Sequence, residues 1–326
     1  MGVTGPVGVA GEVAPERPPE PGLAPSGLWK RIPAPTRTTM RRLAAASLVA
    51  NIVLVVTGGA VRLTGSGLGC PTWPRCTSES FVVHDALGVN GFIEFGNRML
   101  TFVLAAVAVV TWVAAMRLHP ARRSIRLLAT GLLLGIPAQA VVGGITVLTD
   151  LNPWVVSFHL LSSLAMIAVA VVLLRRVDEL DRPANPTVPR PVVVLTRALL
   201  VVAALVLYVG TVVTGSGPHA GSPDAPRNGL APAALSQLHA DLVFLLVGLT
   251  VGTWLALRAT GAPERALRAV RTLLGLELAQ GVVGFTQYLT DLPIVLVGIH
   301  LLGAALVTAA GAWLWLGTRD RGIQRA

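Results

Sequence analysis

The sequence predicts an all-α integral membrane protein, in which eight transmembrane helices form two tandem four-helix bundles related by a pseudo-twofold axis along the membrane normal. Three observations lead to this fold class: an apolar composition, eight apolar segments of spanning length, and an internal repeat. Of the 326 residues, 53% are hydrophobic and only 13% are charged. That balance is too apolar for an ordinary soluble domain, so we expect the chain to lie in a lipid bilayer.

The N-terminal segment, residues 1–42, differs from the rest of the chain. It is rich in proline and glycine and lacks apolar periodicity, so it cannot bury a core and is expected to be a disordered cytoplasmic tail. The first apolar stretch begins only near Leu43, after Arg41 and Arg42. That is too far from Met1 for a cleavable signal peptide, and we expect this stretch to be the first membrane helix.

Spanning the hydrocarbon takes about 20 apolar residues, and eight segments have that length. They are residues 43–61, 95–116, 127–148, 153–174, 194–214, 235–257, 270–289 and 293–316. The expected organisation is an N-terminal bundle (43–176), a cytoplasmic linker (177–193), a C-terminal bundle (194–317) and a cytoplasmic tail (318–326).

The basic residues indicate the orientation of these spans. The chain has 26 Lys and Arg residues, and only Arg62, Arg75, Arg98 and Arg227 fall in the loops of one alternating set. The positive-inside rule therefore puts both termini in the cytoplasm. A net charge of +10 could also suggest nucleic acid as a partner, but the basic residues lie in short segments between apolar runs. The expected partner is the lipid bilayer, and no nucleic acid.

The internal repeat aligns residues 139–159 (QAVVGGITVLTDLNPWVVSFH) with residues 280–300 (QGVVGFTQYLTDLPIVLVGIH) without a gap. The motif Thr-Gly-Ser-Gly also follows both the first and the fifth span. Gln, Thr-Asp and His do not recur at fixed spacing by chance, so we infer a duplication. Each copy has four spans, so both insert with the same orientation, unlike the inverted repeats common in transporters.

Three histidines mark the fourth, sixth and eighth spans at one level near the outer face: His159, His239 and His300. Neutral imidazole is a good axial ligand for haem iron, and facing helices can place two such ligands on one macrocycle. We expect His239 and His300 to form a bis-histidine pair in the C-terminal bundle. The alternative is that each histidine is a hydrogen-bonded packing residue. With only two cysteines, a Cys-rich metal or iron–sulfur scaffold is excluded.

The N-terminal bundle is incomplete by comparison. Asn97 stands where the symmetry calls for a histidine opposite His159, and Glu94 lies one turn away. One strong axial ligand suits substrate binding more than pure electron transfer. Glu94 is a candidate for proton transfer, although a surface ion pair with Arg98 would also explain it.

The first outer loop carries two further features. Its Arg75, together with Arg62 and Arg98, could pair with haem propionates or simply snorkel to the interface. Cys70 and Cys76, with five residues between them, are expected on the oxidising side of the membrane, where a disulfide can persist. A structural bridge and a redox-active pair are both open interpretations.

Taken together, Glu94-Phe-Gly-Asn97-Arg98, the three histidines, Thr-Gly-Ser-Gly and Cys-Pro-Thr-Trp-Pro-Arg-Cys resemble the haem A synthase family over nearly the whole chain after the tail. The resemblance implies an oxidoreductase of the bacterial plasma membrane acting on a CH or CH2 group. It would oxidise the C8 methyl of haem O, through a hydroxymethyl stage, to the formyl group of haem A for cytochrome oxidase assembly.

The resemblance also implies roles for individual residues. His239 and His300 would hold haem b iron, and His159 the iron of substrate haem. Glu94 would be catalytic, with Asn97, Arg98 and Arg62 as substrate-binding residues and Cys70 and Cys76 as a disulfide. Asn97 departs from the family, in which many members have His. Haem O synthase, cytochrome oxidase assembly factors and an unidentified electron acceptor are the implied partners.

Two other functions fit parts of the pattern. A membrane b-type cytochrome would pass electrons without ring chemistry, and a haem carrier would pass haem itself. The incomplete N-terminal ligand set disfavours the first, and Glu94 with the cysteine pair disfavours the second. A prenyltransferase would need aspartate-rich diphosphate motifs, which are absent.

Overall fold

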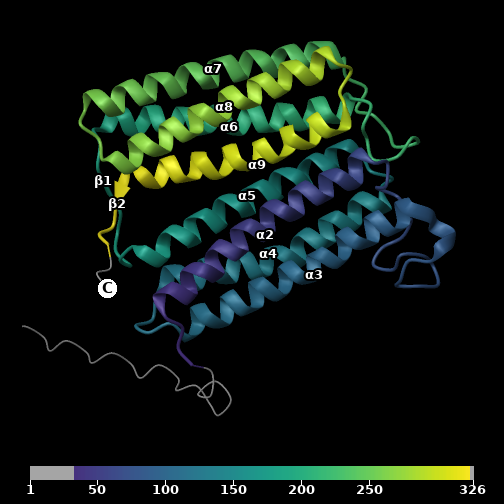
Figure 1. Ribbon diagram of the computed structural model, residues 1–326, viewed down its shortest axis with the longest axis horizontal. Coiled ribbons are helices and arrows are strands. Elements are labelled where there is room, and N and C mark those ends of the chain that lie inside the picture. Colours follow the sequence, from purple (N-terminus) through teal and green to yellow (C-terminus); the bar gives the residue numbers. More distant parts are fainter. Residues whose placement is uncertain (1–32, 324–326) are drawn as a thin grey trace, which may run out of the picture. The chain divides into compact units, whose positions relative to one another are not determined.

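The computed structural model describes residues 33–323, so most of the predicted N-terminal tail and the last three residues lie outside the described part of the chain. Eight α-helices run through it (Figure 1): α2 (Arg37–Leu63), α3 (Gly88–Arg117), α4 (Arg123–Leu148), α5 (Pro153–Asp178), α6 (Arg190–Ser216), α7 (Pro232–Ala259), α8 (Glu264–Leu289) and α9 (Ile294–Gly317). A short 3-10 helix, η1 (Asp85–Leu87), precedes α3. The fold is thus all-helical, as predicted.

Seven of the described helices are long and apolar enough to cross a membrane, against the eight spans predicted. The exception is α8, which has the length but not the apolarity. Its first two turns carry four charged residues, and Glu277 and Gln280 interrupt its apolar part. Membrane-spanning character is therefore established for α2 to α7 and α9 by length and composition, and α8 packs between α7 and α9.

Local sequence explains where the helices begin. The Thr36 side chain accepts a hydrogen bond from the Thr39 N–H, so α2 starts at Arg37, six residues before its apolar stretch and inside the predicted tail. The Asn152 side chain caps α5 in the same way, and Pro153 follows at the first helical position.

The helix contacts form two closed rings, one of α2 to α5 and one of α6 to α9 (Figure 1). Helix α2 contacts α3 and α5, and α4 contacts the same two helices. Helix α6 contacts α7 and α9, and α8 contacts the same two. Between the two sets, α5 touches α6 and α9, and α2 touches α9.

The repeated sequence has a repeated conformation. Asp150 and Leu151 have φ of 51° and 61°, and their counterparts Asp291 and Leu292 have φ of 57° and 59°. Positive φ is uncommon outside glycine. In both turns a leucine N–H donates to the carbonyl five residues earlier, Leu151 to Thr146 at 2.7 Å and Leu292 to Gln287 at 2.8 Å. The two α-α turns are therefore built alike, as the duplication requires.

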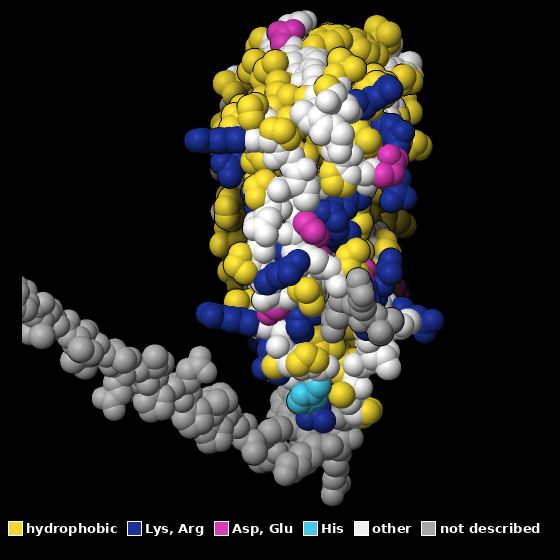
Figure 2. Space-filling view, turned by 90° about the vertical axis from the view of Figure 1, so that its left-hand side faces the viewer, with side chains coloured by type: hydrophobic (Ala, Val, Ile, Leu, Met, Phe, Trp, Pro, Cys, Tyr) yellow, Lys and Arg dark blue, Asp and Glu magenta, His cyan; other side chains and the backbone are white. Residues whose placement is uncertain are grey.

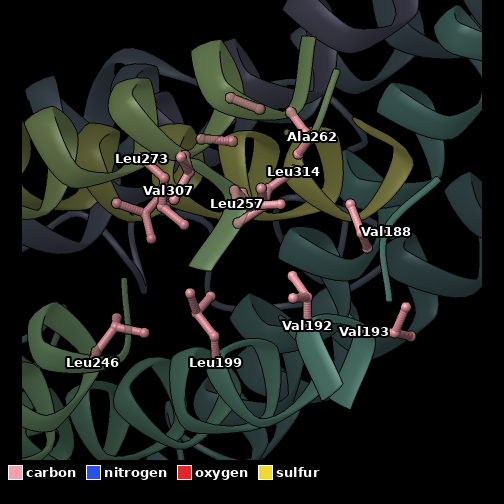
Figure 3. Close-up of a cluster of buried hydrophobic side chains, with 14 of the residues drawn as sticks. Val188, Val192, Val193, Leu199, Leu246, Leu257, Ala262, Leu273, Val307 and Leu314 are labelled. Carbon is pink, nitrogen blue, oxygen red and sulfur yellow. The ribbon is translucent and has the colours of Figure 1, made fainter. Parts of the chain in front are cut away.

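The buried apolar residues lie between the helices. One cluster joins α6, α7, α8 and α9, and Figure 3 shows Leu199, Leu246, Leu273 and Leu314 among its members. A second cluster around Met40 and Leu173 joins α2 to α5. Many apolar side chains point outward instead, including Phe102, Leu134 and Val282, which are more than half exposed. Lipid is the environment that suits such a surface.

A short two-stranded sheet lies after α9. Strand β1 (Asn185–Pro186), from the predicted linker, pairs antiparallel with β2 (Arg319–Asp320), which follows α9. Figure 2 looks onto this end of the helices, and dark blue Lys and Arg side chains are spread across it. This is the end for which the charge pattern predicts a cytoplasmic location.

Candidate functional site

The three histidines lie on α5, α7 and α9, and each has a buried Nδ1 atom without a hydrogen-bond partner in the described structure. A hydrogen-bonded packing histidine would normally satisfy that atom. A buried ring nitrogen that no protein group engages is compatible with ligand binding at each of the three histidines.

A glycine faces each imidazole ring. A Cβ on Gly143 would lie 3.3 Å from Cε1 of His159, and a Cβ on Gly284 would lie 3.5 Å from Cε1 of His300. These two glycines are counterparts in the repeat. On α6, Gly210 gives His239 the same clearance, with a distance of 3.0 Å to Cε1. The sequence marked Gly143 and Gly284 as repeated, but not that they make room for imidazole.

His239 and His300 face each other with ring centroids 6.4 Å apart and ring planes at 67°. Nitrogen–metal bonds of about 2 Å on both sides of one iron would put the two ring centres about 6 Å apart. The pair therefore fits an iron between the rings, and the angle is compatible because each ring can turn about its own bond. The structure brings together the two residues that the sequence paired.

Asn97 sits against α2 rather than free in a pocket. The Thr57 hydroxyl donates to Asn97 Oδ1 at 2.8 Å, and a Cβ on Gly58 would be 3.8 Å from Asn97 Nδ2. His239 occupies the corresponding place against α6. An amide with its oxygen already engaged is a poor partner for iron, in keeping with the incomplete ligand set that the sequence predicted.

Glu94 is buried, with 5% of its surface exposed, and both of its oxygens are engaged. Oε1 accepts from Arg98 Nη2 at 2.6 Å and Nε at 3.1 Å, and Oε2 accepts from the Cys70 N–H at 2.8 Å. The ion pair considered from the sequence therefore exists, but it is buried and bidentate rather than a surface pair.

Arg98 reaches further, into the loop between α2 and α3. Its guanidinium donates to the main-chain oxygens of Cys70, Thr72 and Arg75 at 3.1 to 3.2 Å. Cys70 and Cys76 form a disulfide. We call the segment from Cys70 to Cys76 the disulfide loop. The Glu94–Arg98 pair holds this loop to α3. The sequence alone does not reveal this anchoring, because it depends on the fold of the loop.

The disulfide loop also reaches the helix beside His159. The Trp73 ring lies against Gly144 of α4, where a Cβ would come within 2.4 Å of Cδ2. The next residue back along the chain, Gly143, is the glycine that faces His159. One loop thus contacts Glu94 on α3 and Gly144 on α4, next to the glycine that faces His159. Trp73 was not among the residues expected from the sequence. Its place between Pro71 and Pro74, inside the pair of cysteines, was the available signal for a special role.

Arg62 is engaged in protein contacts. Its Nε donates to the His219 carbonyl at 2.7 Å and its Nη2 to the Thr214 carbonyl at 2.8 Å. Nearby, the Gly67 N–H donates to the Gly221 carbonyl at 2.8 Å. Arg62 therefore ties the end of α2 to the loop that follows α6.

The comparison with known families is decisive at this point. The family model described as COX15-CtaA, cytochrome oxidase assembly protein, matches residues 41–311. The chain belongs to this family. The matched region includes the three histidines, Glu94 and the disulfide loop.

Curated relatives in several bacteria are similar to this chain. The haem A synthase of Listeria monocytogenes is 28% identical over 224 residues, covering 65% of this chain and 73% of its own length. That of Lysinibacillus sphaericus is 27% identical over 191 residues, covering 57% and 62%. That of Geobacillus thermodenitrificans is 28% identical over 117 residues, covering 34% of each chain. The chain thus spans about a third to three quarters of the length of these relatives.

Proposed function

We propose that this protein is a haem A synthase, which oxidises the C8 methyl group of haem O through a hydroxymethyl intermediate to the formyl group of haem A for cytochrome oxidase assembly. The observation that carries the proposal is the facing pair His239 and His300, 6.4 Å apart in a member of this family. The names of its curated relatives support the same activity. The class would be an oxidoreductase acting on a CH or CH2 group.

The architecture we propose for this activity is two tandem four-helix bundles, α2–α5 and α6–α9, related by a pseudo-twofold axis along the membrane normal. Two observations support it: the turns at Asp150-Leu151 and Asp291-Leu292 have the same conformation, and the helix contacts form two closed rings. Both termini would lie in the cytoplasm of a bacterial cell, with the histidines near the outer face of the plasma membrane. The charge distribution supports this orientation.

In the C-terminal bundle, His239 and His300 would hold haem b. When bound, haem b supplies one-electron transfer. The chain's own contribution is steric and geometric. Gly210 and Gly284 leave space for the two rings, and the Gln280 side chain donates to the His300 carbonyl at 2.8 Å, which fixes the α9 backbone at the ligand.

In the N-terminal bundle, His159 would hold the iron of haem O from one side, with Asn97 opposite. Glu94 would act beside the ring methyl as a proton acceptor or as a stabiliser of developing positive charge. Arg98 and the Cys70 N–H orient its carboxylate, so we assign Arg98 a positioning role next to the substrate. Arg62 would hold the outer loops that border the substrate. Trp73 would wall the pocket.

The reaction implies partners. Haem O would come from haem O synthase, haem A would pass to cytochrome oxidase assembly factors, and an electron acceptor would take the electrons removed from the methyl group. These assignments rest on the family and on the chemistry of the reaction.

The test is expression with a source of haem O, followed by pigment extraction and mass analysis. Haem A or its hydroxymethyl precursor is the expected product, and Glu94→Ala should abolish it while bound haem b remains. A haem-loaded protein that never yields either product would overturn the proposal in favour of a b-type cytochrome or a haem carrier. Full conversion by Glu94→Ala would refute the role of that residue alone.

Visible spectroscopy of the purified protein tests the ligand sets separately. One low-spin bis-histidine haem is expected, from His239 and His300. His239→Ala and His300→Ala should each remove it, and His159→Ala should leave it intact. Two low-spin bis-histidine haems would contradict the role given to Asn97.

A further inference from the structure

A second buried carboxyl group lies in the C-terminal helices, apart from the site described above. Glu277, at the middle of α8, is only 3% exposed. Its Oε1 is 2.9 Å from the Thr250 hydroxyl on α7, and its Oε2 is buried without a hydrogen-bond partner in the described structure. Ionisable groups at such positions are costly and usually functional.

The duplication indicates that the fold does not need an acid here. Helices α3 and α7 align through their Thr-Trp pairs at 111–112 and 253–254, and α4 and α8 align through the repeat. Under this alignment an apolar cluster of the first copy corresponds to a polar one in the second. The first consists of Leu104, Ala108 and Ile136, and the second of Leu246, Thr250 and Glu277. An Ile satisfies the packing in one copy, so the Glu in the other has a further role.

Within residues 33–323, no charged side chain pairs with Glu277. The helices packed against α8 are α7 and α9. Their titratable and charged residues, with those of α8 itself, are His239, Asp241, Arg258, Glu264, Arg265, Arg268, Arg271, Tyr288 and His300. Among the described residues, none of these forms a hydrogen bond or ion pair with Glu277. An isolated carboxylate in apolar surroundings is unfavourable, so binding a proton is the means of neutralising it.

The Thr250 hydroxyl suits both protonation states of this acid. It lies 2.9 Å from Glu277 Oε1 and also 2.9 Å from the Leu246 carbonyl oxygen. A hydroxyl has one proton to donate and two lone pairs to accept with. It can donate to a carboxylate, or it can accept from a carboxylic acid while donating to Leu246. The site therefore keeps a hydrogen bond when the proton arrives or leaves.

Glu277 is on the same helix as two residues that contact His300. Gln280, one turn away, donates to the His300 carbonyl, and Gly284, about two turns away, faces the His300 ring. A charge at this distance in a poorly polar interior is felt at the iron, because screening there is weak. Reduction of the iron removes one positive charge, and protonation of Glu277 removes one negative charge.

We propose that Glu277 is a redox-coupled proton site for the haem held by His239 and His300. The haem held there would supply one-electron chemistry. When a one-electron donor reduces it, the Glu277 carboxylate would take up one proton from water, and it would return that proton on oxidation. This inference rests on the proposed haem b site, and it adds a residue that moves a proton without touching the iron.

The test is a redox titration of the purified, haem-loaded protein at several pH values around neutrality, with dithionite as reductant. One proton per electron changes the reduction equilibrium tenfold per pH unit, which is about 59 mV for a one-electron couple. Wild type should approach this slope, and Glu277→Gln should lose it while keeping its haem and absorption spectrum. Redox-difference infrared spectra should show a carboxyl band that the variant lacks.

Two further variants keep the result interpretable. Glu264→Gln removes an exposed carboxyl group from the same helix and should keep both the slope and the band. Glu277→Ile copies Ile136 of the first copy and should fold and bind haem, with a flat titration. A flat wild-type titration with haem bound, or an unchanged slope in Glu277→Gln, would overturn the inference about Glu277 alone. Absence of a bis-histidine haem would overturn it together with the proposed haem site.

Discussion

Replacing Arg98 by alanine is the perturbation that separates a buried clamp from a surface ion pair. The guanidinium donates twice to Glu94 and once each to the carbonyls of Cys70, Thr72 and Arg75. Without it, Glu94 keeps backbone N–H partners in the loop but loses its cation, and three loop carbonyls lose this donor. The disulfide would remain, but the disulfide loop would lose its attachment to α3.

The burial of the pair sets the expected magnitude. Side-chain exposure is 18% for Arg98 and 7% for Glu94. Removing one partner of a buried ion pair costs about 3–5 kcal/mol. Because water can reach the arginine side, we expect a loss near the lower end, about 3 kcal/mol in the free energy of unfolding. An exposed pair would contribute less than about 1 kcal/mol.

The assay is unfolding of the detergent-purified protein, together with trypsin cleavage after Arg75 in the disulfide loop. Arg98→Ala should unfold at lower denaturant and be cut faster, and Arg98→Lys should lie between it and wild type because lysine lacks the planar fork. Arg75→Ala, which removes an exposed side chain but keeps the carbonyl, is the matched control for stability. A loss below about 1 kcal/mol for Arg98→Ala, with unchanged cleavage, would refute the clamp.

Three more predictions concern the interior. Gly210→Ala should lower haem occupancy, because the new methyl would lie 3.0 Å from Cε1 of His239. Gly284→Ala, whose methyl would lie 3.5 Å from Cε1 of His300, should bind haem almost normally. Equal occupancy of the two variants in a pigment assay would argue against this steric account. Asn97→His should add a second low-spin bis-histidine signal to the visible spectrum, and no new signal would mean that this position does not face the first pocket. Thr250→Val should lower the free energy of unfolding by about 1–3 kcal/mol, because it leaves the Glu277 carboxyl without its hydrogen bond. Thermal unfolding measures the loss, and Thr260→Val, at an exposed position at the end of the same helix, is the control.

Much of the fold could be predicted because lipid imposes simple rules on sequence. Backbone groups in hydrocarbon must be satisfied internally, so long apolar segments become helices. The repeat predicted two matched turns, and the structure has positive φ angles at Leu151 and Leu292 in those turns. The predicted span at residues 270–289 is a helix, α8, but Glu277 and Gln280 lower its apolarity below that of its neighbours.

The site was harder to predict, because its residues meet through loop backbone. The spacing of Glu94 and Arg98 indicated an ion pair, but its burial depends on carbonyl groups of the disulfide loop, which have no signature in sequence. Trp73 meets Gly144 across a large sequence separation for the same reason. The pairing of His239 with His300 was predictable, because both lie on helices with known phase and depth.

The anchoring of the disulfide loop bears on the order in which the outer face matures. Arg98 binds main-chain oxygens, and those bonds do not depend on the oxidation state of sulfur. The loop can therefore settle on α3 as soon as the helix is inserted, with Cys70 and Cys76 already beside each other as thiols. Oxidation would then add a covalent link to a conformation that the arginine already holds, and a thiol reductant would open that link without breaking the hydrogen bonds to α3.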